Sequence, residues 1–471
     1  MNRRLAAAAL LALGAASSAG AQEAPALSLR EAVLQALENN PSLKAQRLIP
    51  EIQRTAVGEE LGLLDPLLTA QAGHTLPTAP STAGSGAEAG LSLSFATGTA
   101  LSATLAAGWD PVSAGYDVQV TQSLLAGGRL SANLARVRQA RLDVLASEHE
   151  LRGFTENLVA NVQQAYWDHY LALRQREIYR ESLALAERQL EESRVRAQVG
   201  QIAPIELAAP RAEVVSRREA LREGEKRVQT TRLALLLAIS PPGTDLDAPV
   251  VLADSPAPVR PLDELSKHLS LAMTRRPELL QARLELERGT LEVIRTRNGL
   301  LPRLDAFIAL GGTGYAAAFP DSFPAAVEGS SLSAGLSLEM ALGNRAARAR
   351  AERARLDRVQ AEESLRALER TVEADVRSAW LETGFAAERV STSAELRQLQ
   401  EQTLAAETEK FRNGASTTFL VAQAQRDLLA GQLAEAEAAV GYLLAVTTLY
   451  RLEGTLLERS GVAVEAEKEG P

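Results

Sequence analysis

The sequence contains no cysteine and only four histidines. Without cysteine, the chain has no disulfide framework, no thiol chemistry and no N-terminal cysteine that could carry a lipid. The histidines are scattered without metal-ligand spacing, so we expect neither a zinc or copper site nor any cofactor. These histidines are His74, His149, His169 and His268.

Basic residues are fewer than acidic ones, and the formal net charge is -9. Nucleic acid is therefore not expected as a partner, because a binder of phosphate needs a basic face. An enzyme is not expected either. The one adjacent pair worth considering is Asp168 and His169, and neighbouring residues on a helix point about 100° apart, which makes a poor catalytic dyad.

Long apolar runs are missing after the first residues of the chain. Arg3 and Arg4 are followed by an Ala/Leu-rich stretch and by the small residues 19–21, which is the order of a secretory signal peptide. The alternative for this segment is a buried N-terminal helix. No later segment approaches the ~18 consecutive apolar residues of a spanning helix. A membrane role is therefore expected only through β-strands or partners.

The chain consists of two copies of one plan. Pro41 and Pro277 lie in matching segments 236 positions apart, whereas Gly200 and Gly414 lie in matching segments 214 positions apart. An offset that persists without gaps over about sixty residues predicts a rigid helix. The change between the two offsets places 22 additional residues in the first copy, between about 70 and 130.

The additional residues fall in segments with a period of two. In "LSLSF" (91–95) and "LSATL" (101–105), apolar residues alternate with Ser and Thr, and Gly98 lies between them as a turn residue. The second copy repeats the alternation more briefly at 304–308 and 332–338. This pattern predicts strands, at about 66–125 and 303–341. A soluble β-sandwich is the alternative on pattern alone.

Long helices separate the strands from two interruptions. Residues 131–198 contain no proline and one glycine, which permits a rod of about 100 Å. Apolar residues recur at sevens, the spacing of coiled coils. At Gly200 and again in "KFRNGASTTFLVAQ", a glycine is followed by residues that can begin a new helix, with Ser416 or Thr417 as the cap. We expect helical hairpins, the alternative being one continuous helix.

Strand number limits how the sheet can close. One chain offers four to six strands, whereas the smallest membrane barrels have eight. Open edges are not tolerated in lipid, so we expect a barrel shared among copies. Strand counting alone permits twelve strands from three copies and also a barrel made by two copies.

The organisation predicted from these patterns has five parts. They are a signal peptide (1–21), a first repeat (22–239) with a turn at 199–205, a Pro-rich connector (240–261), a second repeat (262–455) with a turn at 413–419, and a C-terminal tail (456–471).

Taken together, these residues resemble the TolC family of outer-membrane efflux proteins. The segments that carry the resemblance are 27–43, 121–130, 299–306 and 411–454. It implies a mainly α fold with a membrane β-barrel: a homotrimer with a twelve-stranded barrel in the outer membrane of a Gram-negative bacterium and a long periplasmic α-helical tunnel. The implied function is an exit duct from periplasm to exterior in a tripartite efflux or type I secretion-like system.

The resemblance also implies partners and sites. The two hairpin turns would form a periplasmic tip that docks on an adaptor, or membrane fusion, protein linked to an inner-membrane pump of the RND, ABC or MFS type. The implied docking residues are Val199, Gly200, Gln201, Ile202, Ala203, Pro204, Asn413, Gly414, Ala415, Ser416, Thr417 and Thr418. The implied tunnel constriction comprises Glu206, Phe411, Leu420 and Gln423.

The constriction departs from the pattern of the family. Relatives place acidic residues at the positions of Leu420 and Gln423, so Glu206 is the one carboxylate that this chain retains there. The competing function is an exported trimeric coiled-coil structural or adhesion protein without a pore. That alternative does not account for strands at matching points of both copies.

Overall fold

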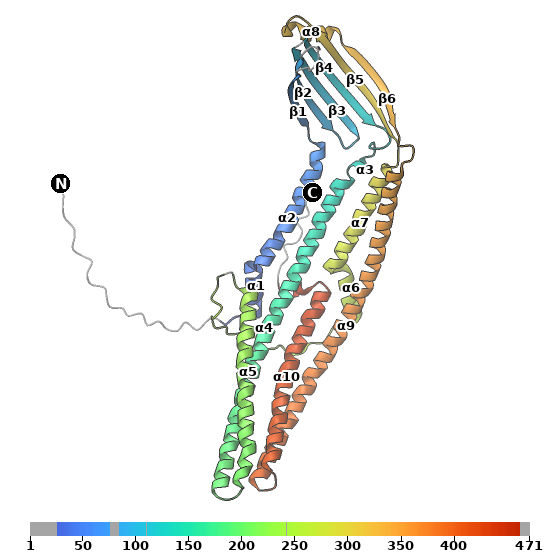
Figure 1. Ribbon diagram of the computed structural model, residues 1–471. Helices are drawn as coiled ribbons and strands as arrows, with labels where there is room; N and C mark the ends of the chain where they lie inside the picture. Colours follow the sequence, from blue (N-terminus) through green and yellow to red (C-terminus); the bar gives the residue numbers. More distant parts are fainter. Residues whose placement is uncertain (1–25, 76–83, 110, 242, 462–471) are drawn as a thin grey trace, which may run out of the picture.

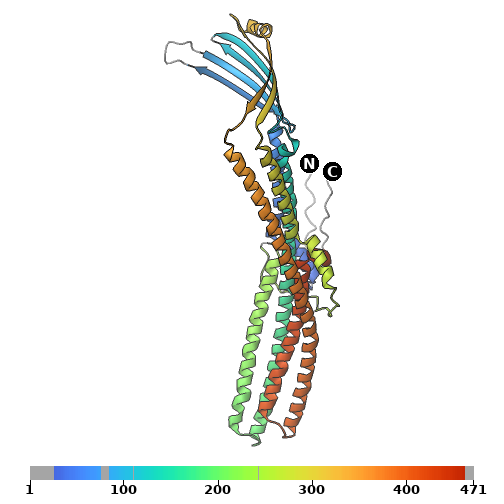
Figure 2. The ribbon, with the colours of Figure 1, turned by 90° about the vertical axis from the view of Figure 1, so that its right-hand side faces the viewer.

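The computed structural model describes residues 26–75, 84–109, 111–241 and 243–461, and the expected signal peptide lies outside these ranges. The chain is an elongated rod with a sheet at one end and two helical hairpins at the other (Figure 1). The hairpins lie side by side and reverse at the same end of the molecule (Figure 2). The two hairpin turns therefore lie at the opposite end of the molecule from the strands.

Both halves of the chain run from short helices through strands to a long helical hairpin. The first half comprises α1 (Leu29–Asn39), α2 (Pro41–Leu61), the 3-10 turn η1 (Gly62–Leu64), β1 (Leu67–Thr75), β2 (Gly84–Ser94), β3 (Thr99–Trp109), β4 (Val112–Ser123), α3 (Leu130–Asn133), α4 (Ala135–Gln198), η2 (Pro204–Leu207) and α5 (Ala208–Ile239). The second half comprises α6 (Leu265–Arg275), α7 (Pro277–Asn298), β5 (Arg303–Tyr315), α8 (Phe319–Glu328), β6 (Ser331–Glu339), α9 (Arg345–Arg412), α10 (Thr418–Leu452) and α11 (Leu456–Arg459).

Six strands form one antiparallel sheet in the order β1-β2-β3-β4-β5-β6. The halves of the chain meet where β4 pairs with β5, for example at Val118 and Leu310. The additional hairpin of the first half, β2 and β3, lies within the sheet. The sheet thus differs from the expectation drawn from the resemblance, because a twelve-stranded trimer takes four strands from each copy.

The sheet has one apolar and one polar face. A row of directly paired residues crosses all six strands on the apolar face: Leu68, Leu91, Ala103, Val118, Leu310 and Leu332. The next row, on the opposite face, is Thr69, Gly90, Thr104, Asp117, Gly311 and Ser331. Side chains alternate along a strand, so one register gives the whole sheet a lipid-type face and a water-type face.

Helix α8 lies against the apolar face at the end of the sheet far from the rods (Figure 1). It fits because β5 has no side chain at Gly312 and Gly314; a Cβ at Gly314 would lie 2.2 Å from the Ala326 backbone nitrogen. Phe319 stacks on Trp109 with the ring centroids 6.4 Å apart. The sequence pattern placed this segment among strands, and the structure shows a helix there.

The rods are close to the expected lengths. Helix α4 spans 64 residues and α9 spans 68, and α4 begins at Ala135, after α3, rather than at Ser131. Among the residues that the structure describes, α10 is the one helix long and apolar enough to cross a membrane by length and composition. It packs against α9 and α4, so its apolar residues form the seam between rods.

A hydrophobic core lies midway along the rods, where α1 packs on α4 and α5. Val33, Tyr166, Leu235 and Val440 are each at most 2% exposed there. The Tyr166 hydroxyl donates a hydrogen bond to the Leu27 carbonyl at 3.0 Å. This core holds the N-terminal segment against the root of the first hairpin, and each apolar side chain contributes about 1.5–3 kcal/mol by leaving water.

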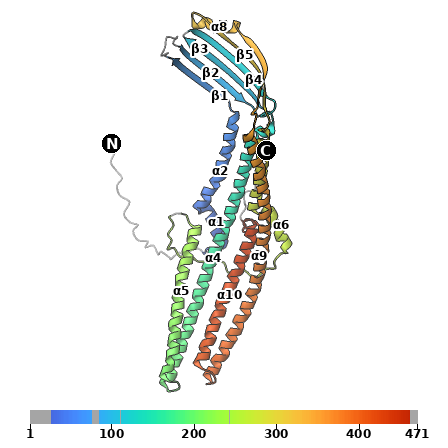
Figure 3. The ribbon, with the colours of Figure 1, turned by 45° about the vertical axis from the view of Figure 1, so that its right-hand side comes forward.

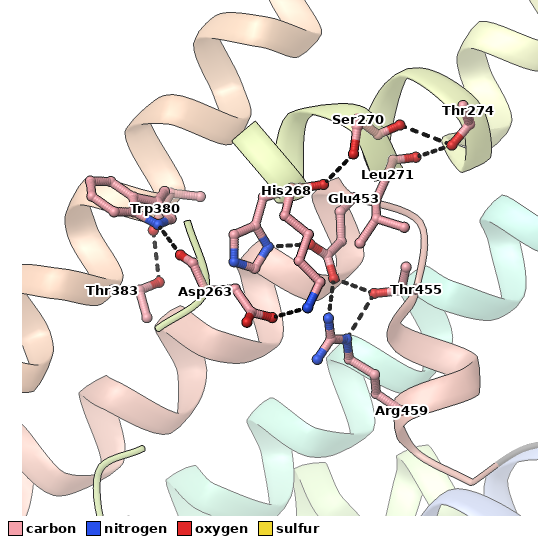
Figure 4. Close-up of polar contacts among 12 residues, drawn as sticks. Asp263, His268, Ser270, Leu271, Thr274, Trp380, Thr383, Glu453, Thr455 and Arg459 are labelled. Carbon is pink, nitrogen blue, oxygen red and sulfur yellow. Dashed lines mark hydrogen bonds and ion pairs between the residues drawn. The ribbon is translucent and has the colours of Figure 1, made fainter. Parts of the chain in front are cut away.

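A buried polar cluster ties α6 to the end of α10 (Figure 4). His268 and Glu453 are at most 1% exposed, and the His268 Nδ1 is hydrogen-bonded to the Glu453 carboxylate. The other carboxylate oxygen accepts from the Thr455 hydroxyl and from Arg459 at 3.1 Å. A buried carboxylate is costly unless it is paired, so the cluster fixes these helices together. The described ranges contain no arrangement of His, Asp and Glu that could hold a metal ion.

Candidate functional site at the helical tip

The first hairpin turn begins where α4 ends. Gly200 has φ of 77°, the left-handed conformation that glycine adopts most readily. The Gly200 N–H donates to the Ala197 carbonyl and the Gln201 N–H to the Arg196 carbonyl, which together make a Schellman helix end. The chain then enters η2 at Pro204, and the Ala203 N–H donates to the Glu206 carboxylate at 3.4 Å.

The second turn repeats the first at the matching positions. Gly414 has φ of 76°, its N–H donates to the Phe411 carbonyl, and the Ala415 N–H donates to the Lys410 carbonyl. Thr417 is the cap of α10, because its hydroxyl accepts from the Leu420 N–H at 3.3 Å. One backbone motif therefore ends both rods, and both turns lie together at one end of the molecule (Figure 3).

Ser416, the other expected cap, has a different partner. Its hydroxyl donates to the Glu407 carboxylate at 2.7 Å, while the Lys410 ammonium lies 2.6 Å from the other oxygen of that carboxylate. Lys410, and then Ser416, hold the pKa of Glu407 below its ordinary value. Ser416 therefore links the turn to α9 by a hydrogen bond and does not cap α10.

Contacts of two arginines join the first hairpin to the second near the tip. The Arg196 guanidinium lies over the Phe411 ring, 4.1 Å from its centroid, a cation–π arrangement. Further along the rods, Arg426 of α10 forms an ion pair with Glu213 of α5 at 3.1 Å. The two hairpins of one copy are therefore held as a pair.

A small cleft of about 100 Å³ lies between the hairpins. Its walls come from α4 and α5 on one side, including Pro210, and from the start of α10 on the other, including Phe419. The two hairpins are therefore not fully packed against each other close to the tip. The contacts that join them there involve the charged side chains of Arg196 and Arg426.

The residues expected to form a constriction divide into two groups. Glu206, Leu420 and Gln423 are exposed, and Leu420 is 44% exposed. Phe411 is buried, at 5% exposed, beneath Arg196. Phe411 therefore lies in the joint between hairpins. The structure leaves only the other three available to face a tunnel.

Several residues of the site were absent from the sequence expectations. Arg196, Glu213 and Arg426 gain their roles only when the two hairpins lie side by side, so no spacing along the chain signals them. One indirect signal exists: Arg196 matches Lys410 at the repeat offset of 214. A basic residue in the last turn of both rods is favoured by the helix dipole.

Comparison with known proteins finds one matching family model and several solved structures with the same fold. A family model for the outer membrane efflux protein matches residues 268–455, the second half of the duplicated plan. Residues 268–455 of this chain are therefore similar to an outer membrane efflux protein domain. The family is one of channel proteins rather than enzymes, and the competing function of a coiled-coil protein without a pore is not supported.

Solved structures of membrane channels share the fold over nearly the whole chain. CusC aligns with a TM-score of 0.71 at 16% identity, covering 90% of this chain and 92% of that one. The Campylobacter jejuni outer membrane channel CmeC aligns with a TM-score of 0.67 at 17% identity, covering 91% and 86%. The open-state Neisseria gonorrhoeae channel MtrE aligns with a TM-score of 0.64 at 17% identity, covering 91% and 89%. No curated protein sequence matches the chain significantly.

The matched family model indicates the surroundings of the two ends of the molecule. Outer membrane efflux proteins are channels of the Gram-negative outer membrane. The sheet, with one apolar face, is then the outer-membrane part, and the rods form the large periplasmic part. The protein is thus an outer-membrane efflux channel with a large periplasmic helical part.

Proposed function

We propose that three copies of this chain form an exit duct that receives cargo from a periplasmic adaptor docked on the helical tip. The single observation that supports this most strongly is the repeated turn. Two Schellman ends, 214 positions apart, place six short turns in one ring when three copies assemble. An inner-membrane pump of the RND, ABC or MFS type would supply the cargo through the adaptor.

The proposed docking surface comprises exposed and partly exposed residues of both turns. Apolar side chains that point into water support this proposal: Val199 is 64% exposed, Ile205 is 79% exposed and Phe419 is 66% exposed. Apolar side chains gathered in this way at the end of a polar rod favour a protein partner. The remaining docking residues are Gly200, Gln201, Ile202, Ala203, Pro204, Asn413, Gly414, Ala415, Ser416, Thr417 and Thr418.

The tunnel constriction is proposed at Glu206, Leu420 and Gln423. Their exposure in a single copy supports this, because a residue that narrows a shared tunnel must not be buried within its own copy. Phe411 has a separate proposed part, as the joint that Arg196 closes between the two hairpins. Opening of the tip then requires the hairpins of each copy to move together or to break that joint.

The repeats divide these tasks between them. In the proposed arrangement, residues 22–239 contribute the Glu206 carboxylate, residues 262–455 contribute Leu420 and Gln423, and the connector at 240–261 lies at the level of the central core. The described part of the tail, 456–461, is fastened through Arg459 to the cluster around Glu453. Export requires removal of the signal peptide at 1–21.

Glu206→Gln tests the proposed constriction. Three carboxylates in one narrow ring concentrate cations, because charges in a confined site are screened less than at an open surface. In single-channel recordings across planar bilayers we expect the cation-to-anion permeability ratio to fall at least twofold. Glu219→Gln, which removes the same charge from an exposed position further up α5, should leave the ratio unchanged. An unaltered ratio in Glu206→Gln would remove that residue from the constriction.

A further inference from the structure

We infer that the barrel of this protein has eighteen strands, closed by hydrogen bonding between β6 of one copy and β1 of the next. The inference rests on the proposed trimer, since three six-stranded sheets give eighteen strands. The interaction surface is the pair of free sheet edges, and the partner is a second copy of this chain.

All six strands have the surface of a barrel wall. The exposed side chains of the apolar face include Leu68 of β1, Leu105 of β3, Ile308 of β5 and Leu336 of β6, at 74%, 54%, 58% and 69% exposed. If β1, β2 and β3 folded away from the membrane, their leucines would face water. The apolar row across the entire register therefore assigns every strand to the lipid boundary.

The two free edges match each other. β1 and β6 each have nine residues. Strand directions alternate through the six-stranded antiparallel sheet, so β6 and β1 run in opposite directions. An added copy can continue the antiparallel ladder, with Leu332 and Leu68 on the same lipid face. The count of eighteen is even, as an antiparallel barrel requires.

Lipid makes the pairing obligatory. Each unpaired backbone N–H or C=O group costs several kcal/mol in hydrocarbon, and an edge of nine residues presents a row of such groups. A single copy cannot satisfy them by closing on itself, because six strands are fewer than the eight of the smallest membrane barrel. A second copy brings the complementary edge without any further element.

The inferred wall encloses a wide exit. Barrel diameter grows roughly in proportion to strand number, so eighteen strands give about one and a half times the diameter of twelve, in the size range of barrels that leave an aqueous channel. The polar face has small residues over much of its area, such as Gly90, Gly311 and Ser333. The large Phe307 ring lies next to Gly335, where an added Cβ would lie 2.9 Å from it. The exit is therefore wider than that of a twelve-stranded barrel.

Cysteine pairs test which strands meet, since the natural chain has no cysteine to interfere. Thr69→Cys on the polar face of β1 is combined in turn with Ser331→Cys, Ser333→Cys or Ser337→Cys on the polar face of β6. Even-numbered steps along β6 keep each cysteine on the same face while sampling the register. After mild oxidation of membranes, we expect at least one pair to give a covalent trimer, threefold heavier than the monomer on non-reducing gels.

The matched set replaces Thr69→Cys by Ser102→Cys on the polar face of β3. A twelve-stranded barrel built from β3 to β6 would join β6 to β3, so cross-linking of this set would overturn the inference. Absence of cross-linking in both sets, from protein whose unmodified form is a trimer by native mass measurement, would overturn it as well. An unmodified protein that is not trimeric would contradict the proposed function itself, which separates the two failures.

Discussion

The two repeats of this chain agree in their helical hairpins and differ in their strands. Both rods end in the same Schellman turn at a constant offset of 214 positions, yet the first repeat supplies four strands and the second two. This architecture therefore tolerates insertion in its sheet and not in its long helices. One extra residue in a long helix rotates everything beyond it by about 100° and misplaces the packed seam. An extra hairpin in an antiparallel sheet preserves both strand direction and face.

Removing the additional hairpin should have the largest effect. β1 ends and β4 begins at the same end of the sheet, so residues 76–110 can be replaced by an Asn-Gly turn between antiparallel strands. Each copy then supplies four strands, and the barrel should narrow by about a third. Electron microscopy of the trimer in nanodiscs measures the diameter, with the natural chain as control. A barrel of unchanged diameter would mean that β2 and β3 lie outside the wall.

Glu156 is buried in the first repeat, whereas the matching residue of the second repeat is exposed. It is 2% exposed on α4, whereas the matching residue 214 positions later is Arg370, which is exposed. Burial, partly opposed by Arg152, raises the pKa of Glu156 from 4.5 to about 7. The folded state therefore binds a proton more tightly than the unfolded state, and this stabilisation is lost as pH rises from about 4.5 to about 7.

Glu156→Gln should accordingly stabilise the protein at pH 8 and not at pH 4. The gain has an upper limit of roughly 3 kcal/mol, since one unit of pKa corresponds to about 1.4 kcal/mol. Denaturant melts of the detergent-solubilised trimer at the two pH values measure it. Arg370→Gln is the control and should show no such pH dependence; equal behaviour of the two variants would show that Glu156 is already ionised at little cost.

The turn glycines should behave alike in both repeats. A side chain in the left-handed conformation costs about 1–2 kcal/mol, so Gly200→Ala and Gly414→Ala should each destabilise by that amount. Gly384→Ala is the matched control. Gly384 lies within α9 with open space around its Cβ position, so alanine there should stabilise by about 0.5–1 kcal/mol. Thermal melting compares the three, and a difference between the two turn variants would break their equivalence.

Periodic patterns along the chain predicted the long helices, the turns between them and the strands. The repeat offsets located both turns, and alternation located the strands, because each feature is set by near neighbours in the sequence. Contacts between segments that are distant in the sequence could not be predicted from periodicity. The pairing of His268 with Glu453, the stacking of Arg196 on Phe411 and the packing of α8 on Gly312 and Gly314 all require the elements to be placed in space first.

Strand number is the instructive case between these extremes. The alternating pattern of "LSLSF" and "LSATL" showed that the first repeat had extra strand-forming residues. It did not show whether those residues join the wall, because a hairpin at the mouth of a barrel would alternate in the same way. The structure shows that the hairpin belongs to the sheet, because Leu91 and Ala103 continue the apolar row between β1 and β4.

The most direct test of the account is a charge placed on the repeated turn. Ala415 is exposed and only its backbone N–H is used in the turn, so Ala415→Arg alters the docking surface without disturbing the fold. Ala430→Arg places the same charge on an exposed position midway along α10. Efflux is measured in cells that depend on this channel, with assembly followed on native gels. We expect Ala415→Arg to abolish efflux with the trimer intact and Ala430→Arg to retain it. Wild-type efflux from an intact Ala415→Arg trimer would contradict docking at the tip.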